Sequence, residues 1–251
     1  MQNGLQLNEN KSEVFIAGTP YQLRAAASIT SVSVAGVMLP VSATLKTLGV
    51  TLDRKLTFGN HVATVVGSCN YHASAIRHIR PLLSTELAKT LTCSLILSRL
   101  DYCNSLLYGA PNTVIAKLQR AQNHAARIVT DSPRLTKSTP LLKSLHWLPV
   151  EQRICFKLAL MTFKVRSTST PVYLSCLLNV RSCPRTLRSS AVPRLDYSTP
   201  RTEFAKRAFR QAAPALWNTL PETVLCCNSV RCFKSRLKTF LFNKVFNCAT
   251  Q

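Results

Sequence analysis

The stretch VIAKLQRAQNHAARIV, residues 114–129, carries two regular patterns. Apolar side chains recur at spacings of four and three, which predicts an amphipathic helix with one buried stripe. The stripe consists of Val114, Leu118, Ala121, Ala125 and Ile128. Basic side chains recur on the adjoining face, at Lys117, Arg120, His124 and Arg127. Hydrogen-bond donors spaced along one flank of a helix can follow a phosphate backbone, so this basic face is a candidate for nucleic-acid contact. The alternative interpretation is an ordinary solvated helix face beside a buried stripe.

Helical periodicity continues on both sides of this stretch and gives way to strand periodicity at the amino end. Further helices are predicted at residues 60–80, from a cap at Ser84 to Gly109, and at 150–166, 202–212 and 229–246. Strands are predicted at 14–17, in a hairpin at 31–39 and at 48–52. We therefore expect a mainly α fold with a small amino-terminal β-hairpin region (α+β), a helical bundle and a looser helical carboxy-terminal extension.

The charge balance points to a polyanionic partner. The chain has 251 residues with 32 Lys and Arg against 10 Asp and Glu, a formal net charge of +22. Residues 1–150 hold 15 basic and 6 acidic side chains, and residues 151–251 hold 17 and 4, so the charge is not confined to a tail. RNA or DNA, bound through the phosphate backbone, is the predicted partner, and a merely cationic protein is the alternative.

Two later helices repeat the design of a basic face beside an apolar one. Lys206, Arg207 and Arg210 line the polar side of the helix predicted at 202–212. Lys234 and Lys238 lie on the polar side of the helix predicted at 229–246. We expect these five residues, with the four of the 114–129 helix, to contact nucleic acid.

Trp147 and Trp217 lie in turns that contain Leu and Pro. Both are predicted to be packing anchors and not base-stacking platforms.

No enzymatic template fits the chain. Its seven scattered glycines form no phosphate-cradling loop, and neither a Gly-x-Ser-x-Gly nor a His-Glu-x-x-His motif occurs. The ten carboxylates are dispersed, whereas two-metal phosphoryl transfer requires several that converge. We therefore predict no catalytic residue, no cofactor and no small-molecule substrate.

The cysteines and histidines do not form a convincing metal site. None of the ten cysteines belongs to a Cys-x-x-Cys pair, so we expect reduced, mostly buried thiols. Cys69, His72 and His78 lie close in sequence but lack a fourth ligand, so no metal is predicted.

The sequence gives no sign of export or of a membrane partner. The first residues lack the basic and apolar regions of a signal peptide. The uncharged run 25–45 alternates with period two and is interrupted by Ser, Thr and Pro, which favours strands over a membrane span. We therefore expect an intracellular protein, nuclear or cytoplasmic.

Several phrases, in order along the chain, resemble one protein family. They are LSRLDYCNSLLYGAP (97–111), IAKLQRAQNHAARIV (115–129), LKSLHWLPVEQRICFKLALMTFK (142–164), TLRSSAVPRL (186–195), RAFRQAAPALWNTLPE (207–222) and FKSRLKTFLF (233–242). Together they resemble the carboxy-terminal part of the reverse transcriptase, an RNA-directed DNA polymerase, of LINE-type non-LTR retrotransposons.

The resemblance implies a division of the chain into three parts. Residues 1–56 would be a palm remnant with a hairpin like the one that grips the primer end. Residues 57–130 would be the thumb-like helical bundle that holds the template–primer duplex. Residues 131–251 would be a basic terminal extension with an irregular connection at 167–200.

The same resemblance bears on activity. In the family, a segment like LNENKSEVF (7–15) follows the palm motif whose paired aspartates hold the catalytic metal ions. This chain contains no Asp-Asp, so Lys11, which matches a lysine after the palm, has no metal site to assist. We expect a truncated protein that binds template–primer and is not an enzyme by itself. A poorly folding retrotransposon relic and a host-recruited interaction module are the alternatives.

Overall fold

The computed structural model describes residues 8, 11–34, 36–181 and 194–247. The chain divides into two compact units, Met1–Thr64 and Val65–Gln251. Parts of the LNENKSEVF and TLRSSAVPRL motifs lie outside the described residues. Helices dominate and the strands form two small sheets, so the predicted fold class is confirmed. The functional division at residues 56 and 130 stays a prediction.

The amino-terminal unit contains the two sheets. In the first sheet, β3 (Val37–Ser42) lies between β1 (Val14–Phe15), which is parallel to it, and β2 (Ser31–Val34), which is antiparallel. The second is a hairpin of β4 (Thr44–Thr47) and β5 (Val50–Asp53), joined by two residues of positive φ, Leu48 and Gly49. This turn geometry suits the right-handed twist of a hairpin. The predicted hairpin across Gly36 is confirmed.

A short helix in the same unit was not expected. Helix α1 (Pro20–Ala25) begins at a capping box, in which the Thr19 hydroxyl accepts the Gln22 N–H and the Gln22 side chain accepts the Thr19 N–H. The sequence TPYQ carries this signal, because Thr three residues before Gln, with Pro at the first helical position, favours a helix start. Its six residues hold no buried side chain and so show no core stripe.

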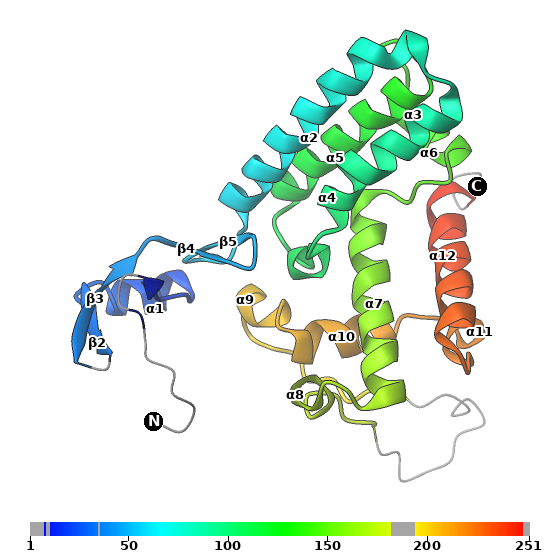
Figure 1. Ribbon diagram of the computed structural model, residues 1–251. Coiled ribbons are helices and arrows are strands. Elements are labelled where there is room, and N and C mark those ends of the chain that lie inside the picture. The colour runs from blue at the N-terminus through cyan, green and yellow to red at the C-terminus, as the bar shows by residue number, and fades with distance from the viewer. Residues whose placement is uncertain (1–7, 9–10, 35, 182–193, 248–251) are drawn as a thin grey trace. The chain divides into compact units, whose positions relative to one another are not determined.

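A bundle of helices forms the first part of the carboxy-terminal unit. It consists of α2 (Gly59–Ile79) from Val65 onward, α3 (Thr85–Thr92), α4 (Ser98–Asp101), α5 (Asn112–Val129) and α6 (Ser138–Ser144), and α2 and α5 run alongside each other in Figure 1. Between α3 and α4 lies a π-helical turn, Cys93–Leu97, and a 3₁₀ turn follows at Asn104–Leu107.

The local signals around α3 are partly confirmed. The Ser84 hydroxyl accepts the Leu87 N–H, as expected for the cap of this helix. The helix predicted to continue to Gly109 is wrong, because it ends at Asp101 and Cys103 adopts a left-handed conformation. Helix α6 begins at Ser138, nine residues after the end of α5 at Val129.

The second part of the carboxy-terminal unit is organised around two long helices. Helix α7 (Val150–Thr168) begins directly after Pro149 and lies beside α12 (Val230–Phe246) in Figure 1. The remaining helices are α8 (Val172–Ser175), α9 (Glu203–Lys206), α10 (Phe209–Trp217) and α11 (Glu222–Leu225). The single helix predicted at 202–212 is therefore wrong, because the chain breaks between α9 and α10.

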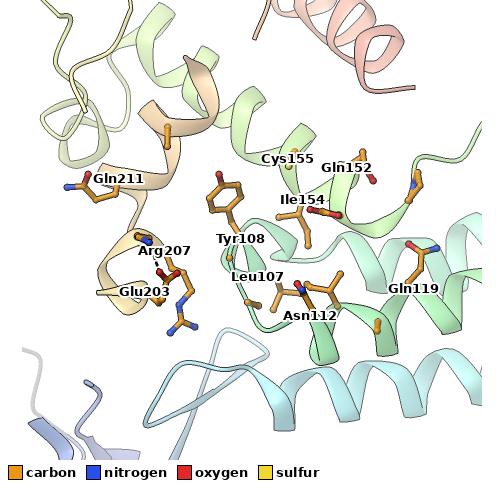
Figure 2. A pocket seen from close by; sticks show the side chains of 18 of the residues that line it. Leu107, Tyr108, Asn112, Gln119, Gln152, Ile154, Cys155, Glu203, Arg207 and Gln211 are labelled. Atoms are coloured by element: carbon orange, nitrogen blue, oxygen red, sulfur yellow. Dashed lines mark hydrogen bonds and ion pairs between the residues drawn. The ribbon is translucent and has the colours of Figure 1, made fainter. Parts of the chain in front are cut away.

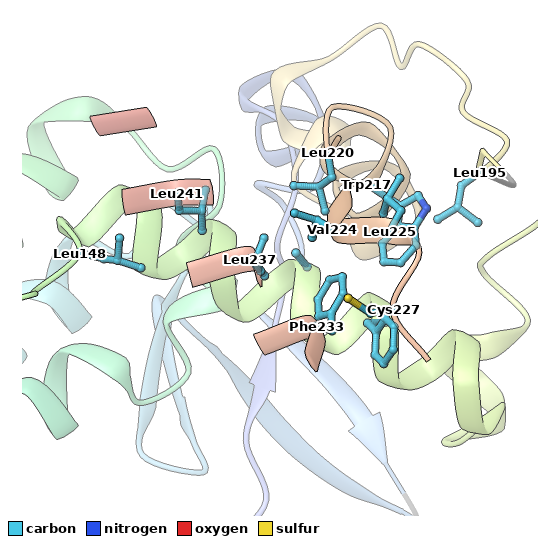
Figure 3. Packing of buried hydrophobic residues seen from close by; sticks show 12 residues of the cluster. Leu148, Leu195, Trp217, Leu220, Val224, Leu225, Cys227, Phe233, Leu237 and Leu241 are labelled. Carbon is cyan, nitrogen blue, oxygen red and sulfur yellow. The ribbon is translucent and has the colours of Figure 1, made fainter. Parts of the chain in front are cut away.

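Aromatic stacking holds the core of this part. Trp217 and Phe233 are fully buried, with ring centroids 5.9 Å apart. Phe163 also stacks on Phe233, with ring centroids 4.3 Å apart. Figure 3 shows Trp217 and Phe233 close to each other in this cluster. The Arg166 guanidinium lies 4.7 Å from the Trp217 ring. Trp147 is buried as well, so the prediction that both tryptophans are packing anchors is confirmed.

The connection predicted to be irregular is anchored at one end. Leu195, near the end of the segment 167–200, is 1% exposed and packs in the same core. The Asn218 side chain accepts the Leu195 N–H at 3.0 Å and donates to the Leu195 carbonyl at 2.9 Å. Pro184, Arg185, Arg188 and Pro193 lie outside the described residues.

Candidate nucleic-acid interface

Helix α5 has the two faces that its sequence predicts. All five residues of the apolar stripe are buried, from Val114 at the first turn to Ile128 at the last. Lys117 and Arg120 are exposed on the adjoining face, whereas His124 and Arg127 are half-buried. The row of four basic residues therefore divides into an open half and a packed half.

The packed half of the row belongs to an arginine cluster. An Arg77 N–H from α2 donates to Nε2 of His124 at 2.7 Å, and Nε of Arg127 donates to the Thr136 carbonyl at 2.9 Å. Burial lowers the pKa of His124, and the charges of Arg77, Arg127 and Arg134 lower it further. His124 is therefore a neutral acceptor at pH 7 and not a fourth cation.

Two members of this cluster escaped the sequence analysis. Arg77 and Arg134 are both exposed, and both lie near the α5 row. Arg77 is in a different helix, and Arg134 follows α5 in the loop before α6, so no periodic pattern connects either with the row. Their guanidinium groups extend the basic surface of α5 onto its neighbours.

The amide side chains of α5 are structural. Gln122 is fully buried, and its Nε2 donates to the Leu148 carbonyl at 2.8 Å. The Gln119 Oε1 accepts the Val150 N–H at 2.9 Å, so it binds the first turn of α7. These bonds satisfy backbone groups at the start of α7 that its own helix leaves unpaired.

The three basic residues predicted on one face at 202–212 are separated. Lys206 and Arg207 line a cavity of about 790 Å³, and Arg210 lies outside its lining, exposed on α10. In Figure 2, Glu203 and Arg207 lie on one side of this cavity, with Leu107 and Asn112 on the other. Lys206 forms an ion pair with Glu203, and the Arg207 guanidinium lies 5.5 Å from the Phe204 ring.

That cavity is not strongly electropositive. Its lining includes the carboxylates of Glu151 and Glu203 besides Lys206 and Arg207, so the charges balance. Burial raises the pKa of Tyr108, which also lines it, so the phenol stays neutral at pH 7. The cavity is therefore a weaker candidate for a polyanion than the face of α5.

Lys234 and Lys238 lie one helical turn apart on α12 and are both exposed. They line a second cavity of about 700 Å³, together with residues of α3 and α7. The structure thus brings these two residues together, as their spacing predicts.

The acidic and sulfur-containing side chains of the described segments lie apart or have structural partners. Within the described ranges, no group of three or more His, Cys, Asp or Glu side chains is placed to hold a metal ion. Burial raises the pKa of Cys69 to about 11, so this thiol is neutral. Asp101 is paired with Arg153, and the Asp53 carboxylate accepts the Thr57 and Phe58 N–H groups in a turn.

Thiol burial differs from the expectation for the cysteines. Cys69 and Cys227 are buried, but Cys176 and Cys226 are exposed. The cysteines of the described segments are free thiols and form no disulfide.

No helix in the described part of the chain is both long and apolar enough to cross a membrane.

Comparison with known proteins identifies one relative of this chain. It is described as "Probable RNA-directed DNA polymerase from transposon BS" of Drosophila melanogaster, and it is 30% identical over 145 residues. The match covers 53% of this chain and 15% of the relative. No family model and no solved structure matches the chain. The chain therefore contains a segment related to the reverse transcriptase of a retrotransposon, as its sequence motifs indicate.

Proposed function

We propose that this chain binds RNA or DNA through the phosphate backbone and does not by itself extend a primer. The observation that carries the proposal is the basic surface of α5, with exposed Lys117 and Arg120 beside the exposed guanidinium groups of Arg77 and Arg134. The relative of this chain is named as an RNA-directed DNA polymerase, and enzymes of that class must hold nucleic acid. The net charge of +22 supports the same partner.

The length of the α5 row suits a nucleic-acid strand. From Lys117 to Arg127 the helix rises about 15 Å, at 1.5 Å per residue. One strand of DNA presents about four phosphates over that distance, at 3.4 Å per charge. Lysine and arginine contacts to those phosphates would release counterions, so binding would weaken as the salt concentration rises.

The proposal assigns α5 and its neighbours to a thumb-like role in holding a template–primer duplex. Lys206, Arg207, Arg210, Lys234 and Lys238 would add contacts from the carboxy-terminal part. The absence of primer extension follows from the chemistry of the 251 residues. Nucleotidyl transfer by two metal ions requires converging carboxylates, and this sequence contains no adjacent pair of aspartates.

The experiment that tests the proposed interface is a salt series with a duplex DNA probe, read by fluorescence anisotropy. The variant Lys117→Ala/Arg120→Ala removes the two exposed cations of α5 and leaves the apolar stripe intact. We expect the slope of log K against log salt to become shallower by about 1.8, because each phosphate contact contributes about 0.9 on duplex DNA.

The matched control is Lys164→Ala/Arg231→Ala, which removes two exposed cations from α7 and α12. It carries the same net charge as the α5 variant. Equal slopes for the two variants would remove α5 from the binding face.

A further inference from the structure

The cavity that contains Lys234 and Lys238 has an unusual concentration of positive charge. Four lysines line it, from three helices that are far apart in sequence: Lys89 of α3, Lys157 of α7, and Lys234 and Lys238 of α12. The lining also includes Arg153 and one carboxylate, Asp101, and these two form an ion pair with each other. The four ammonium groups are therefore not neutralised by an acid of the cavity wall.

Neither ion pair formed among the described residues involves these four lysines. Like charges collected around one cavity repel one another and oppose folding, unless an anion enters between them. Burial raises the pKa of Cys93 in the same wall, and the nearby charges of Arg153 and Lys89 oppose this rise.

Part of the lining is apolar, and this apolar wall consists of Leu97, Leu145, Trp147, Leu148, Phe156 and Leu160. The other lining residues are Cys93, Ser98, Asn104 and His146. Leu148, Phe156 and Leu160 also belong to the core packing around Phe233, so this wall is held rigidly from behind. A volume of about 700 Å³ lies within the range of pockets that bind a small organic group.

One polar group in the wall lacks a partner. Asn104 is 2% exposed, and its Oδ1 accepts no hydrogen bond from the described residues. Its Nδ2 donates to Asp101 at 3.3 Å. A buried acceptor without a donor is costly, so Asn104 is a destabilising feature of this wall.

We propose that this cavity binds one nucleotide of a single-stranded nucleic acid, with its base against the apolar wall and its flanking phosphates on the four lysines. This inference rests on the proposed function and specifies its partner further. A free phosphate or a duplex backbone would use the lysines alone and leave the apolar wall exposed. Only a base that is not paired with a second strand can turn away from its neighbours and enter such a cavity.

The test uses the full chain and a fluorescein-labelled, short single-stranded oligouridylate in a salt series. The cavity variant is Lys157→Ala/Lys234→Ala/Lys238→Ala. Its matched control is Lys164→Ala/Arg231→Ala/Lys244→Ala, which removes one exposed cation from α7 and two from α12, none of which lines the cavity. The cavity variant is expected to lower the salt slope by about two units, at about 0.7 per phosphate of a single strand, while the control leaves it unchanged.

A second probe tests for the base. An abasic oligomer with the same number of phosphates is expected to bind the unaltered chain about tenfold more weakly than oligouridylate, because stacking of a base contributes to binding. Equal binding of the two probes, or equal loss in the cavity variant and its control, would overturn the inference. Binding of anionic phosphatidylserine vesicles that oligouridylate does not displace, lost only in the cavity variant, would also overturn it.

The outcome is separable from that of the proposed function. If the α5 variant weakens duplex binding while the cavity variant binds oligouridylate like the unaltered chain, the cavity inference fails and the proposed function stands. If the unaltered chain binds neither probe at low salt, both fail.

Discussion

Among single residues, His124 connects α5 to α2, because its Nε2 accepts an N–H from Arg77. A protonated imidazole would lose that acceptor and would face the guanidinium groups of Arg77, Arg127 and Arg134. His124 therefore organises the surrounding arginines and does not add a charge to them.

The pH dependence of stability tests this account of His124. Its pKa in the folded chain lies below the ordinary value of 6.5. At pH values between the folded and the unfolded pKa of His124, the unfolded chain binds a proton that the folded chain does not. The contribution of His124 to the free energy of unfolding is therefore fully present above pH 6.5 and is lost as the pH falls toward the folded pKa. We expect His124→Asn, which keeps an acceptor for Arg77, to lose less stability on acidification.

The measurement is urea unfolding at about pH 7.5 and about pH 5, followed through the midpoint and slope of the transition. His61, whose pKa is also lowered by burial, titrates equally in both proteins and cancels in the comparison. The control is His78→Asn, at an exposed position. An identical pH dependence for His124→Asn and the unaltered chain would contradict the account.

Among the elements, α5 is held by polar side chains near its middle and at its carboxy-terminal end. Gln119 and Gln122 connect it to the start of α7. At its carboxy-terminal end, the Arg80 guanidinium donates to the carbonyls of Ile128 and Val129, both at 2.9 Å. These carbonyls belong to the last turn, where a cation is favoured by the helix dipole. The basic face of α5 is thus fixed in position by polar contacts as well as by its apolar stripe.

Removal of Arg80 tests this anchoring. Arg80→Ala leaves partly buried carbonyls without donors, so we expect the free energy of unfolding to fall by about 2 kcal/mol. Arg80→Lys, which keeps the charge but cannot donate to several carbonyls at once, is expected to restore only part of the loss. The measurement is urea unfolding, with Lys164→Ala as a control at an exposed position. If Arg80→Ala lowers the free energy of unfolding no more than this control does, Arg80 does not anchor α5.

The sequence predicts the elements that depend on local patterns and misses the breaks that depend on packing, for physical reasons. The stripe on α5 and the cap at Ser84 depend on local periodicity and local hydrogen bonds, so both could be read in advance. The break after Asp101, with Cys103 at positive φ, and the division of 202–212 into α9 and α10 depend on tertiary packing. No period of 3.6 residues encodes such breaks.

The candidate site follows the same rule. Lys117 and Arg120 were predictable because they share one helix face. The cluster of Arg77 and Arg134 around His124 was not, because its members come from different segments. Likewise, the spacing of Lys234 and Lys238 was visible in the sequence, but their association with Lys89 and Lys157 around an apolar wall required the fold.

At the scale of the whole molecule, the charge is the dominant property. A net charge of +22 on 251 residues opposes compactness unless a polyanion compensates it. The carboxy-terminal unit nevertheless has a packed aromatic core under its basic helices. Such a core provides a rigid support for basic side chains.

One purified sample and one labelled RNA–DNA primer–template test both parts of the proposed function, binding and the lack of primer extension. Anisotropy is measured across a salt series, and the same sample is then given deoxynucleotides and magnesium. We predict binding that weakens steeply with salt and no extension of the primer. Extension, or no binding even at low salt, would contradict the account.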